Sequence, residues 1–291
     1  MKNRLLTALG MVIFGVPILI FSHYIVYPIA LGVLAAIATC ELLHAFGLLR
    51  KLYITIPTCI MAFALPFCSN NLFLTTDMHK TYFLIVALSA FAYLLYLAAV
   101  AVISAGSISF RQVSQVYTSV VFVVVSFTSM SLLRYMPLGQ YFFELIFIGA
   151  WVCDSFAYFT GRLFGKHKLS PKLSPKKTIE GAIGGLVFNI GGCMLYGLIM
   201  ELVTKNVDSL VELDANYIVL AILGLVLGVV SMIGDLWASL IKRECGIKDY
   251  SRILPGHGGI LDRFDSILAV ATVLMVICMF FPPFREVATA I

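Results

Sequence analysis

The sequence predicts an all-α fold: a polytopic integral membrane protein of about nine transmembrane helices whose N-terminus is cytoplasmic. Of its 291 residues, 61% are hydrophobic and 12% are charged, whereas about 25% of the residues of a soluble domain are charged. A water-soluble fold of this size could not bury so much apolar surface. Two further observations support the prediction, a series of apolar stretches and an uneven distribution of Lys and Arg between them.

Nine stretches come close to the roughly 20 apolar residues that a helix needs to cross a bilayer. They are residues 5–21, 25–49, 53–67, 83–103, 117–133, 142–159, 181–202, 217–241 and 267–281. The third stretch is short, which is consistent with a tilted span, a re-entrant helix or a span with other boundaries. The first follows Lys2 and Arg4, as in a signal peptide, but no small-residue cleavage site comes soon after it. We therefore expect the first stretch to remain as a span.

The loops between these stretches differ in their content of Lys and Arg, which accumulate on the cytoplasmic side of membrane proteins. If nine spans alternate from a cytoplasmic N-terminus, 16 of the 20 Lys and Arg residues fall in cytoplasmic segments. The sequence therefore predicts a single membrane domain, residues 1–291, with N-terminal spans in 1–135 and C-terminal spans in 136–291. The C-terminal part includes two basic cytoplasmic loops, 161–180 and 242–266.

The eighth stretch contains an acidic residue, Asp235. A carboxylate inside a membrane span is costly unless it is paired, coordinated or hydrated, so such a residue indicates function. Ser239 and Lys242 follow at four and seven residues, and these spacings place all three side chains on one helix face. An acid, a hydroxyl and an amine therefore form a stripe that leads toward the basic loop 242–266.

This basic loop has the residue types that bind a nucleoside triphosphate. Lys and Arg neutralise phosphate charge, and Arg can hold two phosphate oxygens at once. The glycines of the turn 256–259 let the backbone approach an anion closely. Asp262 and Asp265 follow at the start of the ninth stretch and would share a face if that start is helical. Carboxylates together with substrate phosphates are the ligands that Mg2+ prefers.

The 27 residues from Ser239 to Asp265 resemble the signature of the phosphatidate cytidylyltransferase (CDP-diglyceride synthase) family, without a departure. Residues 154–166 and 174–181 are also similar to that family, and together the three blocks cover roughly the C-terminal half. The resemblance implies a nucleotidyltransferase that makes CDP-diacylglycerol and diphosphate from CTP and phosphatidate. It also implies Mg2+ as cofactor, a multi-pass enzyme of the bacterial inner membrane, often a homodimer, and no nucleic-acid partner.

The resemblance also implies roles for single residues. Asp235 and Asp262 match metal ligands and, with Lys242, Arg243 and Asp265, form the predicted catalytic set. The predicted substrate-binding residues are Ser239, Lys248, Asp249, His257, Gly258, Gly259, Arg263, Lys176, Lys177 and Asp154. For His257, contact with phosphate and a role in shaping the turn both remain open.

Four further features have simpler interpretations. Thr178 is a plausible N-cap for the seventh span, and Glu180 beside it fits either a structural role at the helix N-terminus or a catalytic one. Glu41 and Glu144 lie within spans, where we expect them to pair locally with neighbouring helices. The glycines of 181–185 and 191–192 indicate close packing of helices.

The reaction that the resemblance implies is an attack of a phosphatidate oxygen on the α-phosphorus of CTP. Its catalysis would consist mainly of positioning and charge neutralisation. A CTP-dependent polyprenol or lipid kinase is the alternative among enzymes, and it would release CDP. A transporter or channel is the alternative from another class, because intramembrane acids also mark ion pathways. Against it, the charges cluster at one face and are not spread through matched inverted halves.

Overall fold

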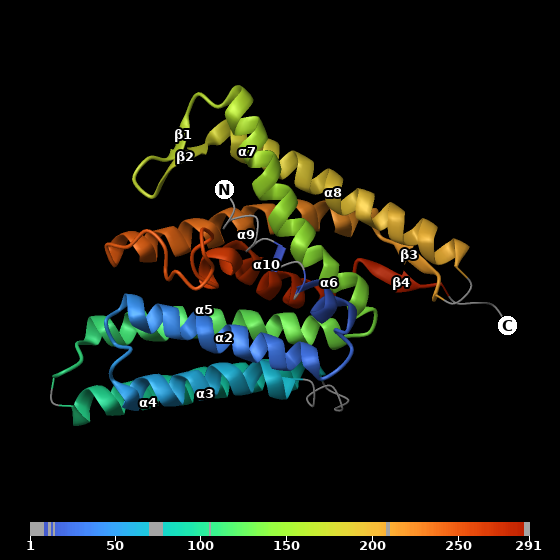
Figure 1. Ribbon diagram of the computed structural model, residues 1–291. Coiled ribbons are helices and arrows are strands. Elements are labelled where there is room, and N and C mark those ends of the chain that lie inside the picture. Colours follow the sequence, from blue (N-terminus) through green and yellow to red (C-terminus); the bar gives the residue numbers. More distant parts are fainter. Residues whose placement is uncertain are drawn as a thin grey trace. The chain divides into compact units, whose positions relative to one another are not determined.

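The computed structural model describes residues 9–10, 13, 15–69, 78–104, 106–207 and 210–287 (Figure 1). The chain divides into two compact units. The N-terminal unit consists of Met1–Tyr135 and Ile241–Phe264, and the C-terminal unit consists of Met136–Leu240 and Asp265–Ile291. The segment after Leu240, which contains most of the basic loop 242–266, therefore groups with the N-terminal helices.

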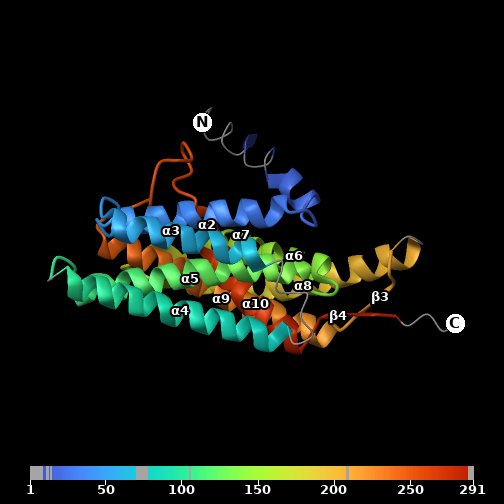
Figure 2. The ribbon, with the colours of Figure 1, turned by 90° about the horizontal axis from the view of Figure 1, so that it is seen from below.

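Four helices build most of the N-terminal unit: α2 (Val26–Ala45), α3 (Leu52–Cys68), α4 (Met78–Ile103) and α5 (Phe110–Tyr135). Helix α2 packs on α3 and α5, and Figure 2 shows α4 alongside α5. Gly32 permits the close approach of α2 to α3, because a Cβ there would lie 2.8 Å from the Phe63 carbonyl oxygen. Hydrophobic residues such as Leu42 and Phe127 form the buried core.

The C-terminal unit begins with α6 (Gly139–Phe147), one π-helical turn (Ile148–Val152) and α7 (Cys153–Phe164), which form one continuous span. A hairpin of β1 (Lys168–Ser170) and β2 (Ser174–Thr178) then leads into α8 (Ile179–Asn206). Its antiparallel register pairs Lys168 with Thr178 and Ser170 with Ser174. A second small sheet joins β3 (Leu213–Ala215) to β4 (Phe284–Glu286), with Asp214 opposite Arg285.

Two long helices, α9 (Tyr217–Glu244) and α10 (Leu261–Phe280), complete the fold. The boundary between the two units falls within both helices, after Leu240 in α9 and after Phe264 in α10. The close approach of α9 to α10 in the C-terminal unit depends on Gly234, where a Cβ would lie 2.8 Å from the Asp265 carbonyl oxygen.

The predicted all-α multi-span membrane protein is confirmed, but the count of nine spans is not. Among the described residues, seven helical segments are long and apolar enough to cross a membrane: Val26–Ala45, Lys80–Ile103, Phe110–Tyr135, Gly139–Phe164, Ile179–Asn206, Tyr217–Glu244 and Leu261–Phe280. The predicted third span is the shorter α3, with 17 residues and two internal prolines. Part of the predicted first span, 5–21, lies outside the described residues, namely residues 5–8, 11, 12 and 14.

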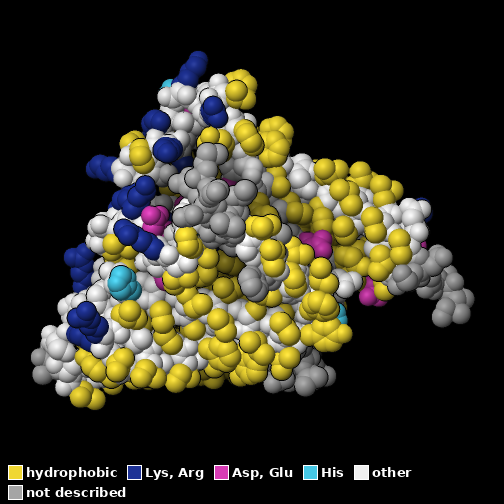
Figure 3. Space-filling model, in the orientation of Figure 1, with side chains coloured by type: hydrophobic (Ala, Val, Ile, Leu, Met, Phe, Trp, Pro, Cys, Tyr) yellow, Lys and Arg dark blue, Asp and Glu magenta, His cyan; other side chains and the backbone are white. Residues whose placement is uncertain are grey.

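The surface of α8 has the character of a helix that faces lipid. Large hydrophobic side chains such as Ile183, Val187, Leu195 and Leu202 are exposed along it. Figure 3 shows hydrophobic side chains over α8 and a concentration of Lys and Arg over the β1–β2 hairpin. The basic segment 161–180 is thus partly folded, since α7 continues to Phe164 and the hairpin follows. The sequence did not predict the strands, because pieces of three and five residues carry no readable periodicity.

Helices α7 and α8 are in close contact because glycines line their interface. A Cβ at Gly181 would lie 2.6 Å from the Ala157 carbonyl oxygen, and one at Gly185 would lie 2.8 Å from the Cys153 carbonyl oxygen. The predicted packing role of these glycines is confirmed. For Gly191 the prediction is wrong, because nothing lies within 4 Å of a Cβ at that position.

Replacing Gly181 by Ala should therefore push α7 and α8 apart and lower both thermal stability and activity. The added methyl group would meet backbone atoms, which cannot move aside as the end of a flexible side chain can. Gly191→Ala in the same helix is the matched control and should be neutral or slightly stabilising, because Ala favours a helix over Gly by about 1 kcal/mol. Melting temperatures of the two purified variants measure the difference, and equal values would contradict the packing argument.

Candidate functional site

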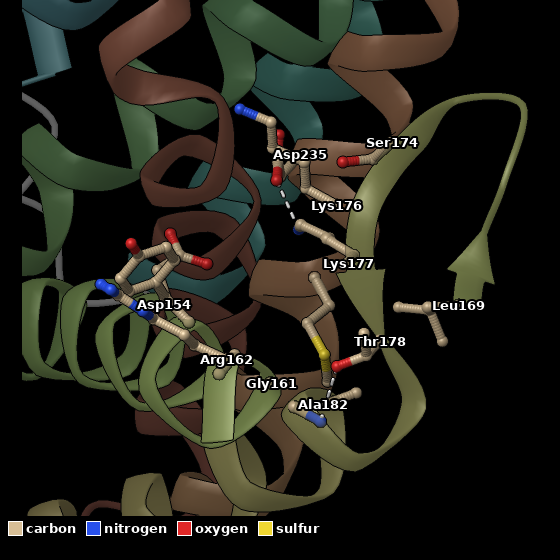
Figure 4. Close-up of a pocket in the computed structure, with 14 residues that line it drawn as sticks. Asp154, Gly161, Arg162, Leu169, Ser174, Lys176, Lys177, Thr178, Ala182 and Asp235 are labelled. Carbon is tan, nitrogen blue, oxygen red and sulfur yellow. Dashed lines mark hydrogen bonds and ion pairs between the residues drawn. The ribbon is translucent and has the colours of Figure 1, made fainter. Parts of the chain in front are cut away.

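A pocket of about 370 Å³ lies in the C-terminal unit (Figure 4). Helix α7, the β1–β2 hairpin, the start of α8 and the middle of α9 contribute its walls. The residues that line it are Asp154, Ala157, Tyr158, Gly161, Arg162, Leu169, Ser174, Lys176, Lys177, Thr178, Gly181, Ala182, Met232 and Asp235.

Two carboxylates from different helices face this pocket, Asp154 on α7 and Asp235 on α9. The ammonium group of Lys177 forms an ion pair with Asp235 Oδ2, and the two side chains are 24% and 27% exposed. On α10, Ser266 Oγ donates to Asp154 Oδ2 at 3.2 Å. The ion pair explains how α9 can carry an acidic residue within an apolar span, because the charge has a partner.

Basic side chains outnumber the acidic ones around the pocket. Arg162, Lys176 and Lys177 line it together with the two aspartates. Arg162 and Lys176 are exposed, so both can reach a ligand that enters from solvent. Such a set attracts a phosphorylated ligand through its cations and offers hard oxygen ligands to a divalent metal.

The local fold around the pocket depends on the N-terminus of α8. Thr178 Oγ1 accepts the Gly181 N–H at 3.1 Å, so the predicted N-cap is confirmed. Glu180 accepts the backbone N–H groups of Lys166 at 3.0 Å and His167 at 3.2 Å, and its Oε1 lies 2.6 Å from His167 Nδ1. These contacts tie the segment after α7 to the start of α8. They favour the structural role of Glu180, and its catalytic role stays a prediction.

A second polar cluster lies in the N-terminal unit, where the ends of α9 and α10 meet the segment 245–260, which we call the signature loop. Asp262 accepts three hydrogen bonds, from Lys242 Nζ at 2.8 Å and from the N–H groups of Tyr250 and Gly259 at 2.9 Å each. The Lys242 ammonium also lies 5.4 Å from the centre of the Tyr250 ring. Asp262 is only 8% exposed, so these contacts organise the loop around a buried charge.

The glycine turn of the signature loop requires residues without a side chain. Gly256 and Gly258 have φ angles of 78° and 87°, a region that favours glycine. A Cβ at Gly258 would also lie 2.8 Å from Asp262 Oδ2. The Leu254 and Gly258 backbones exchange two hydrogen bonds across the turn, at 2.9 and 3.1 Å. His257 Nδ1 is buried in this turn and has no hydrogen-bond partner among the described residues.

The structure thus gathers the predicted residues in two places. Asp154, Lys176, Lys177 and Asp235 meet in the pocket of the C-terminal unit. That unit also includes Ser239, which is buried in α9, and Asp265, which accepts the Ser266 N–H at 2.9 Å. Lys242, Gly258, Gly259 and Asp262 meet at the signature loop of the N-terminal unit.

The other predicted residues of the signature segment lie at the surface. Arg243, Lys248, Asp249 and Arg263 are exposed, and Arg243 Nη1 reaches only the Ile247 carbonyl oxygen, at 3.4 Å. Exposed cations are available to an incoming polyanion, which is compatible with their predicted contacts to phosphate.

Sequence reasoning missed two groups at these sites. Arg162 lines the pocket. It could have been predicted as a site residue because it lies in the block 154–166, which resembles the family. Glu41, which the sequence assigns to local pairing, contacts the signature loop. The local pairing of Glu144 is confirmed, because it accepts the hydroxyl of Tyr196 on α8 at 2.9 Å. Within the described residues no group of three His, Cys, Asp or Glu side chains could hold a metal.

The apolar helices and the pocket together indicate a multi-pass membrane protein whose C-terminal unit has a pocket lined by three cations and two carboxylates. The sequence profile of the cytidylyltransferase family matches residues 2–281, and the chain belongs to that family.

Bacterial relatives are similar to the chain, and two of those compared match it along nearly its whole length. A phosphatidate cytidylyltransferase of Staphylococcus epidermidis is 35% identical over 277 residues, which is 95% of this chain and 98% of the relative. One of Staphylococcus aureus strain COL is 34% identical over the same shares. A third, of Haemophilus influenzae, is 43% identical over 131 residues, 45% of this chain and 43% of the relative.

Proposed function

We propose that this nucleotidyltransferase is a phosphatidate cytidylyltransferase, which converts CTP and phosphatidate into CDP-diacylglycerol and diphosphate. The observation that carries the proposal is the pocket of the C-terminal unit. It combines the Asp235–Lys177 pair with Asp154 and two further cations. The similarity to relatives of that name extends over 95% of the chain, so it includes every element that builds this pocket.

The reaction forms a bond between a phosphatidate oxygen and the α-phosphorus of CTP. The bond between that phosphorus and the bridging oxygen to the β-phosphate breaks, and diphosphate leaves with the electron pair. The attacking oxygen is already anionic near neutral pH, so the protein has little need of a strong base. Arg162, Lys176 and Lys177 would hold the phosphates and offset their negative charge, which brings two anions together in one place.

The proposal includes Mg2+ as cofactor. The pocket fits this ion, because two carboxylates are the usual protein contribution to a magnesium site that substrate phosphates complete. Asp235 would hold the ion, with Asp154 beside it. When bound, Mg2+ would neutralise charge on the phosphates of CTP and of the leaving diphosphate. The assignment of Asp262 as a second ligand stays a prediction, since its contacts in the structure are those of the signature loop.

The membrane location follows from the substrates as well as from the spans. Phosphatidate stays in the bilayer, whereas CTP comes from the aqueous phase, so the site must be open to both. An acidic residue in a span near basic segments meets that need. We place the enzyme in the bacterial inner membrane with a cytoplasmic N-terminus, and a homodimer is part of the same proposal.

The direct test supplies the purified protein with phosphatidate, Mg2+ and CTP labelled at the α-phosphorus, in parallel with CTP labelled at the γ-phosphorus. A cytidylyltransferase should move the α-label into the lipid fraction and the γ-label into diphosphate. A lipid kinase would instead move the γ-label into lipid and release CDP. A protein that leaves both labels in CTP under these conditions would contradict the proposed function.

A further inference from the structure

Helix α2 carries a buried acidic residue whose partners are more than 200 residues away in the sequence. Glu41 is 3% exposed and accepts three hydrogen bonds. Ser251 Oγ donates to Oε1 at 2.6 Å, the Ile260 N–H donates to Oε1 at 2.9 Å, and the Leu261 N–H donates to Oε2 at 2.8 Å. All of these residues belong to the N-terminal unit, so one compact body holds the arrangement.

These contacts make Glu41 the cap of a helix that belongs to another part of the chain. Helix α10 begins at Leu261, and the first N–H groups of a helix have no acceptor within it. Glu41 accepts the N–H groups at this end and brings a negative charge to the positive end of the helix dipole. Hydrogen bonds to a carboxylate are roughly twice as strong as neutral ones, so the carboxylate fixes where α10 begins.

The signature loop is held between two carboxylates. Asp262 accepts the N–H groups of Tyr250 and Gly259, while Glu41 holds the adjacent residues Ser251 and Ile260. The loop is therefore held twice at Tyr250–Ser251 and twice at Gly259–Ile260. The fit is tight, because a Cβ at Gly259 would lie 2.4 Å from Glu41 Oε1. Loss of either carboxylate would release one of the two contacts at each of these places.

We propose that Glu41 is a positioning residue for the reaction. It sets the conformation of the signature loop and so the place of the Lys242–Asp262 pair and of the exposed cations Lys248 and Arg263, without touching substrate itself. This inference rests on the proposed function, because the loop cations are expected to bind the phosphates of CTP. The N-terminal half of the chain thereby acts on a segment that follows 200 residues later.

The test replaces Glu41 by Gln, which keeps the shape of the side chain and removes its charge. The KM for CTP should rise about tenfold, the value of one lost hydrogen bond to a charged group, and kcat should fall. Hydrogen exchange of the backbone amides in 250–261 should become faster. Glu144→Gln is the matched control, since it makes the same change at another glutamate of a membrane span, whose partner Tyr196 belongs to the C-terminal unit, and it should leave both values unchanged.

A rise in KM separates positioning from a merely structural role, because a smaller folded fraction lowers the apparent kcat and leaves KM unchanged. Ser251→Ala removes one donor to Glu41 and should raise the KM for CTP about threefold. In the double variant the two effects should not add, since both act through one contact. If Glu41→Gln fails to fold, Ser251→Ala decides by the same two measurements.

A KM for CTP equal to that of the wild type, or unchanged exchange in 250–261, would overturn the inference. A failure of the proposed function can be distinguished from a failure of this inference by the activity of the wild type. In that case the wild type makes no CDP-diacylglycerol, whereas the exchange experiment still shows whether Glu41 holds the loop.

Discussion

Asp235→Asn should lower kcat by about a hundredfold or more, because it removes the negative charge that we propose holds Mg2+ in the pocket. Asn is neutral and a poor ligand for Mg2+, and it leaves the Lys177 ammonium without its partner in a partly buried position. The protein should still insert and purify normally, since Asn is less costly than Asp within an apolar span. Formation of CDP-diacylglycerol from CTP by the purified variant is the measurement.

Asp214→Asn is the control for this experiment. It makes the same chemical change at an exposed residue of β3, outside the pocket, and should leave activity unchanged. Near wild-type product formation by Asp235→Asn would refute both the metal assignment of Asp235 and the role of the pocket in the reaction.

Asp262→Asn should have an effect of similar size for a different structural reason. Three donors surround the two oxygens of Asp262, namely Lys242 Nζ and the N–H groups of Tyr250 and Gly259. Asn offers one oxygen, and its amide nitrogen would face a donor, which costs about 1–3 kcal/mol for each buried group left unsatisfied. The signature loop should therefore loosen, and the activity of the purified variant should fall about a hundredfold.

The Mg2+ concentration that gives half-maximal activity separates the two roles of Asp262. A metal ligand, as the sequence predicts, would make this concentration rise in the residual activity of Asp262→Asn. A residue that only organises the loop would leave it unchanged, while exchange of the Tyr250 and Gly259 amides becomes faster. Glu244→Gln, an exposed change at the end of α9, is the control. Full activity in Asp262→Asn would contradict both roles.

The amino-acid sequence was sufficient to predict the class of protein and its family. Hydrophobic content and the length of the apolar stretches decide whether a chain can span a bilayer, and both can be read directly from the linear sequence. Local spacing also sufficed for the N-cap at Thr178, because capping depends on residues a few positions apart.

Which polar groups contact one another could not be predicted before the helices were seen packed together. That Lys177 pairs with Asp235 in the pocket with Asp154, and that Glu41 caps α10, depends on which helices lie side by side. The reason is that helix packing is set by the sum of many weak side-chain contacts along whole helices, such as those at Gly181 and Gly32. These contacts cannot be evaluated from any short stretch of sequence, so the partners of a buried charge can be identified only once the packing of the helices is known.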